Sequence, residues 1–290
     1  MGLRLRRRYR ALLLGGILLL GACSSTTFVY NRLDFLVPWY VDDYAELNTQ
    51  QELYLANLLA PFLTWHRSQE LPAYVEIIAA IQASLDQPQT PAGVEATFAR
   101  MEAAWLRLED AALTWLLDLG AQLSAAQIAG FLEVLQEQQA EFEEEFASRS
   151  DEEFQEDSYD NLAESVKDYL GALSAEQQAL LHEASRRLLR SDRAWLAERT
   201  LWLQELAVLL KREPQWQQRL RDAVSRRRGN PSPDYLRIYE YNMRVIYELV
   251  ATLLNGRSEK QDRFLRDKLD ALHRDLETLI AEGRPLTASP

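Results

Sequence analysis

The sequence predicts an all-α fold, an antiparallel multi-helix bundle of about eight or nine helices with heptad-like seams. Apolar residues recur at alternating intervals of three and four along most of the chain, for example at Leu265, Leu269, Leu272, Leu276 and Leu279. A sustained two-residue alternation, which would indicate β-strands, occurs nowhere in the sequence. Connections of two to six residues between most of the expected helices favour antiparallel neighbours.

Helix starts are marked by capping-box patterns, which satisfy the unpaired amides of a first helical turn. Three segments place Ser three residues before Gln: SAAQ (124–127), SAEQ (174–177) and SEKQ (258–261). Thr90 followed by Pro91 is a further start, since Pro is favoured at the first helical position. We therefore expect helices near 49–86, 91–120, 124–149, 151–171, 174–212, 214–228, 233–255 and 258–282. Proline should interrupt the first of them, at Pro61 or at Pro72.

The longest expected helix, 174–212, carries a large apolar residue at every seventh position. These residues are Leu181, Leu188, Trp195, Trp202 and Leu209. Such a recurrence is typical of a core seam. The clearest linker is RRRGNPSPD (226–234), which contains Gly, Asn and two Pro. It could separate a carboxy-terminal hairpin, but the apolar stripes of that hairpin need a partner surface, so we expect a single helical domain over 31–290.

The chain opens with a basic segment followed by a short apolar run. Arginines stand at positions 4, 6, 7, 8 and 10, and the run ALLLGGILLLGA occupies 11–22. This order predicts a secretory signal peptide over 1–22 that is removed. The run has 12 residues, whereas a helix needs roughly 20 to cross a bilayer. A permanent transmembrane anchor is therefore the weaker alternative.

The leader ends in Leu-Gly-Ala directly before Cys23, the one cysteine of the sequence. This segment resembles the lipobox of bacterial lipoproteins. The resemblance implies cleavage between Ala22 and Cys23, and acylation of the thiol and of the new amino terminus with fatty acids such as palmitate. Only a thiolate can form the thioether, and two acyl chains suffice for stable anchoring. Ser24, rather than Asp, implies delivery to the periplasmic face of the outer membrane of a Gram-negative bacterium. The alternative is an ordinary secretory signal, with 23–30 as a tether in either case.

The composition excludes some classes of protein. The net charge is -12, and removal of the leader makes it more negative because five arginines are lost and no acid. Nucleic acid is therefore not an expected partner. A hydrophobic content of 47% supplies ample material for a core.

Aromatic residues crowd the segment FVYNRLDFLVPWYVDDY (28–44), which begins five residues after Cys23. Five residues span at most roughly 18 Å, so these rings must lie close to a membrane to which Cys23 is anchored. Trp and Tyr favour the interface between acyl chains and headgroups. The membrane-proximal candidates are Phe28, Tyr30, Phe35, Trp39 and Tyr40. The alternative is that Phe35, Trp39 and Tyr40 are buried under the first helix.

Two segments of opposite charge follow further along the chain. Thirteen acidic residues lie between Glu133 and Glu164, and from Arg186 to Arg228 there are 12 basic against 5 acidic residues. The basic segment could bind lipid or glycolipid phosphates, or it could face the acidic segment within the fold. Its ligand-binding candidates are Arg186, Arg187, Arg190, Arg226, Arg227 and Arg228. The carboxylates could serve an enzyme or a metal site, but a solvated helix face explains them as well.

No catalytic residue, cofactor or metal ligand is identified. The histidines His66, His182 and His273 are far apart, and none stands in the paired spacing of a metal site in a bundle. Nucleophile motifs, Gly-rich phosphate loops and paired-cysteine metal motifs are absent from the sequence. We therefore do not expect an enzyme.

Two resemblances complete the sequence evidence. The segment YNRLDFLVPWYVDDY, with LNTQQ and WHRSQELP (65–72), resembles the opening of an uncharacterised family of Gram-negative lipoproteins defined by a domain of unknown function. The segments LSAAQ (123–127) and LSAEQ (173–177) are similar to a motif of small helical periplasmic chaperones. We expect a lipid-anchored periplasmic bundle with a non-enzymatic binding or structural role, in one version chaperone-like. Its partners would be the membrane, through acyl chains on Cys23, and an unknown envelope protein or lipid.

Overall fold

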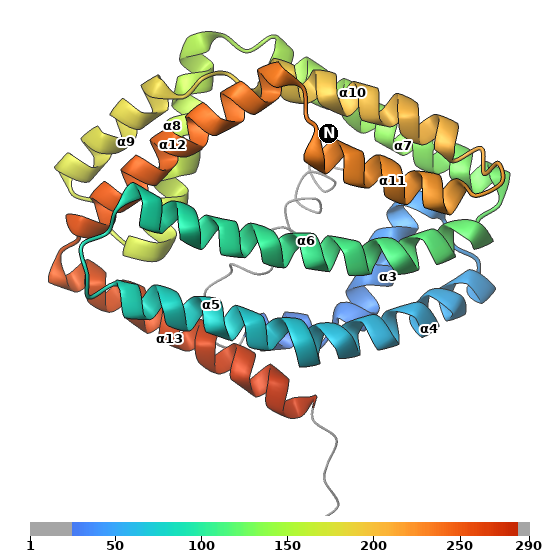
Figure 1. Ribbon diagram of the computed structural model, residues 1–290, viewed down its shortest axis with the longest axis horizontal. Coiled ribbons are helices and arrows are strands. Elements are labelled where there is room, and N and C mark those ends of the chain that lie inside the picture. Colours follow the sequence, from blue (N-terminus) through green and yellow to red (C-terminus); the bar gives the residue numbers. More distant parts are fainter. Residues whose placement is uncertain (1–24, 284–290) are drawn as a thin grey trace, which may run out of the picture. The chain divides into compact units, whose positions relative to one another are not determined.

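The protein is built from α-helices, as a computed structural model of residues 25–283 shows (Figure 1). The fold is 86% helical, has no strand among these residues, and confirms the prediction of an all-α bundle. The signal peptide, Ala22 and Cys23 lie outside the described residues. The elements are α2 (Ser25–Tyr30), α3 (Leu33–Ala45), α4 (Thr49–Trp65), η1 (His66–Glu70), α5 (Leu71–Ser84), α6 (Pro91–Gln122), α7 (Ala125–Phe142), η2 (Glu143–Ala147), α8 (Asp151–Leu170), α9 (Ala175–Arg187), α10 (Asp192–Leu209), α11 (Trp216–Gly229), α12 (Pro233–Asn255) and α13 (Glu259–Glu282).

These helices pack into two compact units. The first unit contains the helices from α2 to α5, residues 97–122 of α6, and α13. The second contains residues 88–96 and the helices from α7 to α12. Helices α12 and α13 are consecutive in sequence, yet they belong to different units. The single domain expected over 31–290 stays a prediction.

The first unit is closed by the carboxy-terminal helix. Helix α13 lies along α5, and α3 lies along α4. Four of the five leucines in the apolar stripe of α13 are buried, Leu272 is half-buried, and Leu279 is completely inaccessible to solvent. Leu55 and Leu71 are also completely buried in this unit. Truncating such a leucine to alanine costs about 2–5 kcal/mol, so α13 contributes strongly to the stability of the unit that carries the amino-terminal helices.

The interruption expected in the helix 49–86 occurs before Pro72 and not at Pro61. Helix α4 continues through Pro61, which is exposed. At His66–Glu70 the chain widens into one turn of π-helix, in which the amide of Leu71 donates to the carbonyl of His66. Proline has no amide to donate, and its ring clashes with the carbonyl four residues earlier. A wider turn before Pro72 relieves this conflict without ending the helix.

The prediction of one helix over 174–212 is wrong, because the chain leaves the helical conformation between α9 and α10. Leu188 has an extended backbone, with φ -63° and ψ 131°. Leu189, which follows Leu188, is held by the side chain of Asn242 in α12. The side-chain oxygen of Asn242 accepts from the amide of Leu189, and its nitrogen donates to the carbonyl of Leu189, both at 2.8 Å. These bonds replace the helical partners that Leu189 gives up. The seven-residue recurrence therefore runs over two helices instead of one seam.

The helix starts predicted from capping boxes are confirmed at α7 and α9. Ser124 and Ser174 each form a complete capping box with the side chain three residues later, and Ser150, which was not predicted as a cap, forms another at α8. Thr90 accepts from the amide of Gly93 at 3.1 Å. The LSAAQ and LSAEQ segments are thus the caps of α7 and α9, and this local role accounts for their residues.

We expect replacement of Asn242 by alanine to destabilise the second unit. The variant leaves the amide and carbonyl of Leu189, which are partly buried, without partners, at a cost of about 1–3 kcal/mol. Asn255, also in α12, makes the same pair of bonds to Gln89, but at an exposed site. Asn255→Ala should therefore cost less. The shift in the urea midpoint of the two variants measures the difference, and equal shifts would contradict the proposed importance of the Asn242 clamp.

Candidate functional site

The aromatic segment after Cys23 forms α2 and α3, and it exposes several of its rings. Phe28 is 59% exposed, Phe35 66% and Trp39 43%. Tyr30 is buried. Tyr40 is half-buried, and its hydroxyl lies 3.0 Å from that of Tyr44. The alternative that Phe35 and Trp39 are buried under the first helix is therefore wrong for both residues.

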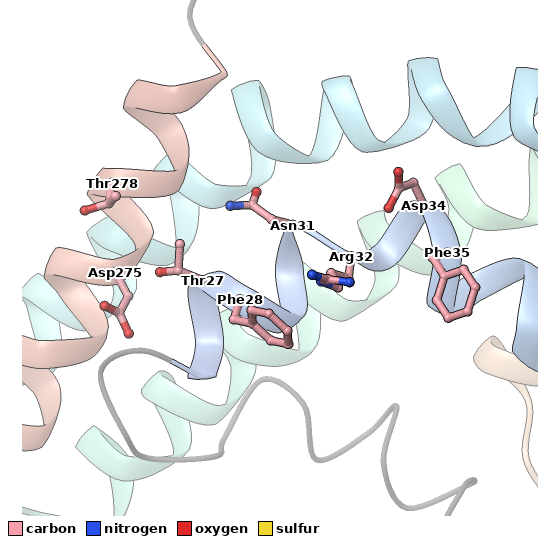
Figure 2. A pocket seen from close by; sticks show the side chains of 8 residues that line it. All are labelled: Thr27, Phe28, Asn31, Arg32, Asp34, Phe35, Asp275 and Thr278. Atoms are coloured by element: carbon pink, nitrogen blue, oxygen red, sulfur yellow. The ribbon is translucent and has the colours of Figure 1, made fainter.

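The exposed rings lie on α2 and on α3. Phe35 and Trp39 are four residues apart in α3, which places both side chains on one face of that helix, and Phe28 belongs to α2. Arg32 lies between the first two rings, as Figure 2 shows, and its guanidinium stands 4.6 Å from the centre of the Phe28 ring. We call the side chains of Phe28, Arg32, Phe35 and Trp39 the aromatic face.

A pocket of about 890 Å³ opens beside the aromatic face, between α2, the start of α3, and α13 (Figure 2). It is lined by Thr27, Phe28, Asn31, Arg32, Asp34, Phe35, Asp275 and Thr278. The pocket thus combines two aromatic rings with one guanidinium, two carboxylates and two hydroxyls. Such a mixture suits a ligand that has an apolar part and charges of both signs.

Two polar contacts attach α2 to the π-helical turn. The hydroxyl of Tyr30 lies 2.9 Å from Nδ1 of His66. The side-chain oxygen of Asn31 accepts from Nη2 of Arg67 at 2.6 Å, and its nitrogen donates to Glu282 at 3.0 Å. Arg67 also donates to the carbonyl of Leu279 at 3.2 Å. The wall of the pocket is therefore fixed to both η1 and α13.

His66 is held as a neutral imidazole at the centre of these contacts. Its exposed fraction is 6%, and the hydroxyl of Tyr74 lies 3.4 Å from Nε2. Burial lowers the pKa of His66 to about 4, although the carboxylate of Glu70 opposes the shift. Burial also raises the pKa of Tyr30 and of Tyr74 to about 12. Both tyrosines therefore stay neutral. Because a neutral imidazole has one N–H and one acceptor nitrogen, one hydroxyl donates to His66 and the other accepts from it.

Glu70, in the same π-helical turn, is a buried carboxylate with a dedicated partner. It is 3% exposed. Nε and Nη2 of Arg107 in α6 donate to its two oxygens at 2.8 and 2.9 Å. This bidentate pair compensates for the loss of hydration that a buried carboxylate suffers. The pair ties η1 to α6 within the first unit.

The sequence did not predict these groups as site residues. His66, Glu70 and Tyr74 follow one another at intervals of four, which places them on one helical face. That spacing was the available signal, but Arg67, Ser68 and Gln69 between the first two make the segment look solvated. Asp275 and Thr278 gave no such sign, since only the packing of α13 beside α2 brings them to the pocket.

The structure separates the ligand-binding candidates of the basic segment and gives several of them acidic or aromatic partners. Arg187 forms an ion pair with Glu248 at 2.6 Å, and Arg226 with Glu205 at 2.7 Å. Arg227 stands over the Trp202 ring at 5.1 Å. Arg186 is exposed and Arg228 is half-buried. Arg186, Arg187 and Arg190 belong to the end of α9 and the residues after it, whereas Arg226, Arg227 and Arg228 belong to the end of α11.

The basic and acidic segments meet at the break between α9 and α10. Arg190 pairs with Asp151 at 2.9 Å and with Asp192 at 2.8 Å, and Arg149 reaches Asp192 at 3.3 Å. Burial alone would raise the pKa of Asp192, but hydrogen bonds from Arg190, the amide of Arg193 and Arg149 lower it. The sequence left open whether the basic and acidic segments pair within the fold. They do so at this break, through Arg190 and Asp151.

The acidic residues between Glu133 and Glu164 are all exposed. Across residues 25–283, no cluster of three or more His, Cys, Asp or Glu side chains has the geometry to hold a metal ion. The acidic segment is accordingly a solvated surface of the second unit. Its carboxylates serve helix starts and ion pairs, as Glu153 does in the capping box of α8.

None of the helices within 25–283 combines the length and the apolar character needed to cross a bilayer. The fold and the site thus define an all-helical protein with an exposed aromatic face beside a polar pocket. The chain belongs to the family of unknown function DUF6279, whose model matches residues 43–236. The matched region begins within the last residues of the YNRLDFLVPWYVDDY block. No curated protein and no solved structure matches the chain.

We expect His66 to make stability depend on pH below neutrality. Its folded pKa, about 4, lies below the ordinary histidine value of 6.5, so the unfolded state binds more protons between these two pH values. The stabilisation is complete above pH 6.5 and is lost as the pH falls toward 4. The pKa shift corresponds to a loss of a few kcal/mol in the free energy of unfolding, at about 1.4 kcal/mol per pKa unit. Urea unfolding of the wild type and of His66→Gln between pH 7 and 4 measures it. The wild type should lose more stability than the variant, and parallel curves would contradict the prediction.

Proposed function

We propose that the protein is a lipid-anchored component of the bacterial cell envelope, at the periplasmic face of the outer membrane, that binds membrane lipid without catalysis. The observation that carries the proposal is the aromatic face of α2 and α3, with Phe28 59%, Phe35 66% and Trp39 43% exposed. Isolated exposed rings are common on protein surfaces, but a row of them supports a contact. Here the row begins five residues after the proposed lipidation site, Cys23.

The position of the aromatic face favours a membrane over other partners. Helix α2 begins two residues after Cys23, so an acylated Cys23 would keep these rings within reach of the lipid headgroups. Full burial of a Phe side chain contributes about 1.5–3 kcal/mol. If acyl chains hold the protein at the membrane surface, contact of the rings with lipid becomes intramolecular. Even partial burial of a ring is then enough to maintain the contact.

Binding of lipid phosphates through the basic segment is the second candidate for a membrane contact. Arg187, Arg190 and Arg226 are engaged in ion pairs, and ligand phosphates would compete with these carboxylates. The geometry therefore favours the aromatic face. A chaperone-like role rested on the LSAAQ and LSAEQ segments, and in the structure these segments cap helices.

The membrane contact is tested with the protein from Ser24 to Pro290, which contains every described residue but no lipidation site. It should float with phosphatidylcholine vesicles at physiological salt. We expect replacement of Phe28, Phe35 and Trp39 by serine to weaken partitioning at least tenfold, since each ring loses about 1 kcal/mol or more of apolar burial. The matched control replaces Leu201, Val208 and Leu236, which are also exposed, and should partition as the wild type does. Equal loss in both triple variants would contradict the proposal.

The anchor itself is tested in cells. The full chain should incorporate labelled palmitate, and Cys23→Ala should abolish this incorporation because the chain has no other thiol. Ser24→Ala, which keeps the thiol, is the control and should be labelled. Persistent labelling of Cys23→Ala would exclude lipidation at this position.

A further inference from the structure

We propose that the pocket between α2, α3 and α13 binds the phosphoethanolamine headgroup of a phospholipid. In this assignment Asp275 accepts hydrogen bonds from the primary ammonium and Arg32 pairs with the phosphate. The acyl chains leave over Phe28 and Phe35. This inference rests on the proposed membrane contact and adds the class of lipid to it.

The ammonium end of the pocket is formed by α13 and α2. Asp275 is half-buried, and desolvation raises the pKa of its carboxyl group against the smaller opposing effect of Arg274. In the described part of the chain, the carboxylate has no hydrogen bond or ion pair. A primary ammonium would supply both the missing charge and the missing donors. Thr27 and Thr278 line the same end, as Figure 2 shows, and their hydroxyls can accept further hydrogen bonds from it.

The phosphate end is formed by Arg32, which is exposed at the turn between α2 and α3. Its guanidinium lies over the Phe28 ring at 4.6 Å, and this contact leaves the edge of the guanidinium, where the N–H groups lie, available to a phosphate. Asn31, the neighbouring polar group of the lining, is occupied by Arg67 and Glu282. Arg32 is therefore the group that would hold the phosphate.

The charge of the pocket selects the class of headgroup. The lining contains one guanidinium and two carboxylates, those of Asp34 and Asp275, so a headgroup with a net negative charge gains little there. A zwitterionic headgroup matches both signs. Among zwitterionic headgroups, phosphocholine presents a quaternary ammonium that cannot donate hydrogen bonds, whereas phosphoethanolamine presents three N–H donors. The desolvated carboxylate of Asp275 therefore favours phosphoethanolamine.

The size and position of the pocket agree with a lipid. Its volume of about 890 Å³ lies within the roughly 300–1,000 Å³ typical of ligand sites. The apolar part of the lining, Phe28 and Phe35, is exposed to more than half of its area. A headgroup held between Asp275 and Arg32 would thus have its acyl chains directed along rings that the proposed function places at the membrane interface.

The test compares vesicles that differ only in headgroup methylation. The protein from Ser24 to Pro290 is floated with phosphatidylcholine vesicles and with equimolar mixtures of phosphatidylcholine and phosphatidylethanolamine that carry the same acyl chains. We expect at least fivefold stronger partitioning to the mixture. Asp275→Asn should remove this preference, so that partitioning to the mixture falls to the value for phosphatidylcholine alone. Asp267→Asn, the same charge change on an exposed residue of α13 outside the pocket, should keep it.

Arg32→Gln tests the contact with the phosphate separately from the contact with the ammonium. Both headgroups contain the phosphate, so this variant should bind both kinds of vesicle more weakly and keep the preference, whereas Asp275→Asn should remove the preference. Equal wild-type binding to both vesicles, or a preference that survives in Asp275→Asn, would overturn the headgroup assignment and leave the proposed membrane contact standing. Unchanged binding of Arg32→Gln would overturn the phosphate assignment. Absence of binding to either vesicle would overturn the proposed function and this inference together.

Discussion

The hydrogen bond between Tyr30 and His66 fixes the short helix on which the candidate site depends. Helix α2 has six residues, and an isolated helix of this length is not stable in water. It is ordered here because Tyr30 reaches His66 at 2.9 Å and Asn31 reaches Arg67 at 2.6 Å. Arg67 in turn donates to the carbonyl of Leu279 in α13. The pocket wall thus depends on one turn of π-helix that presents His66 and Arg67 to α2.

This arrangement has an energetic cost that its neighbours offset. The imidazole of His66 and the carboxyl group of Glu70 are both buried in η1, at 6% and 3% exposure. Each would destabilise the fold if its partners were lost, but two tyrosine hydroxyls and the guanidinium of Arg107 occupy their polar atoms. Hydrogen bonds of this kind contribute orientation more than stability. In this protein the bond between Tyr30 and His66 fixes α2 against η1.

The sequence predicted the helices well and the site only in part. Hydrophobic spacing and capping residues are local, so they gave the all-α fold and the starts of α6, α7 and α9. The break after α9 depends on Asn242, which lies 53 positions from Leu189 in the sequence. No local sequence pattern therefore predicts it. The aromatic segment was recognised as a candidate surface from composition alone. Its pocket was not, because Asp275 comes from a helix more than 200 residues away in sequence.

Electrostatics explains why a membrane contact in this chain would rest on aromatic rings. The protein carries a net charge of -12, and an anionic lipid surface repels such a protein over roughly one Debye length, about 8 Å at physiological salt. Attraction by scattered arginines is further reduced because Arg187, Arg190 and Arg226 already pair with carboxylates. Apolar burial acts at contact distance and does not depend on charge. A face with two phenylalanines, a tryptophan and one arginine would therefore suit an acidic protein under the proposed anchoring by acyl chains. A zwitterionic headgroup has no net charge, so such a face would meet it without net repulsion.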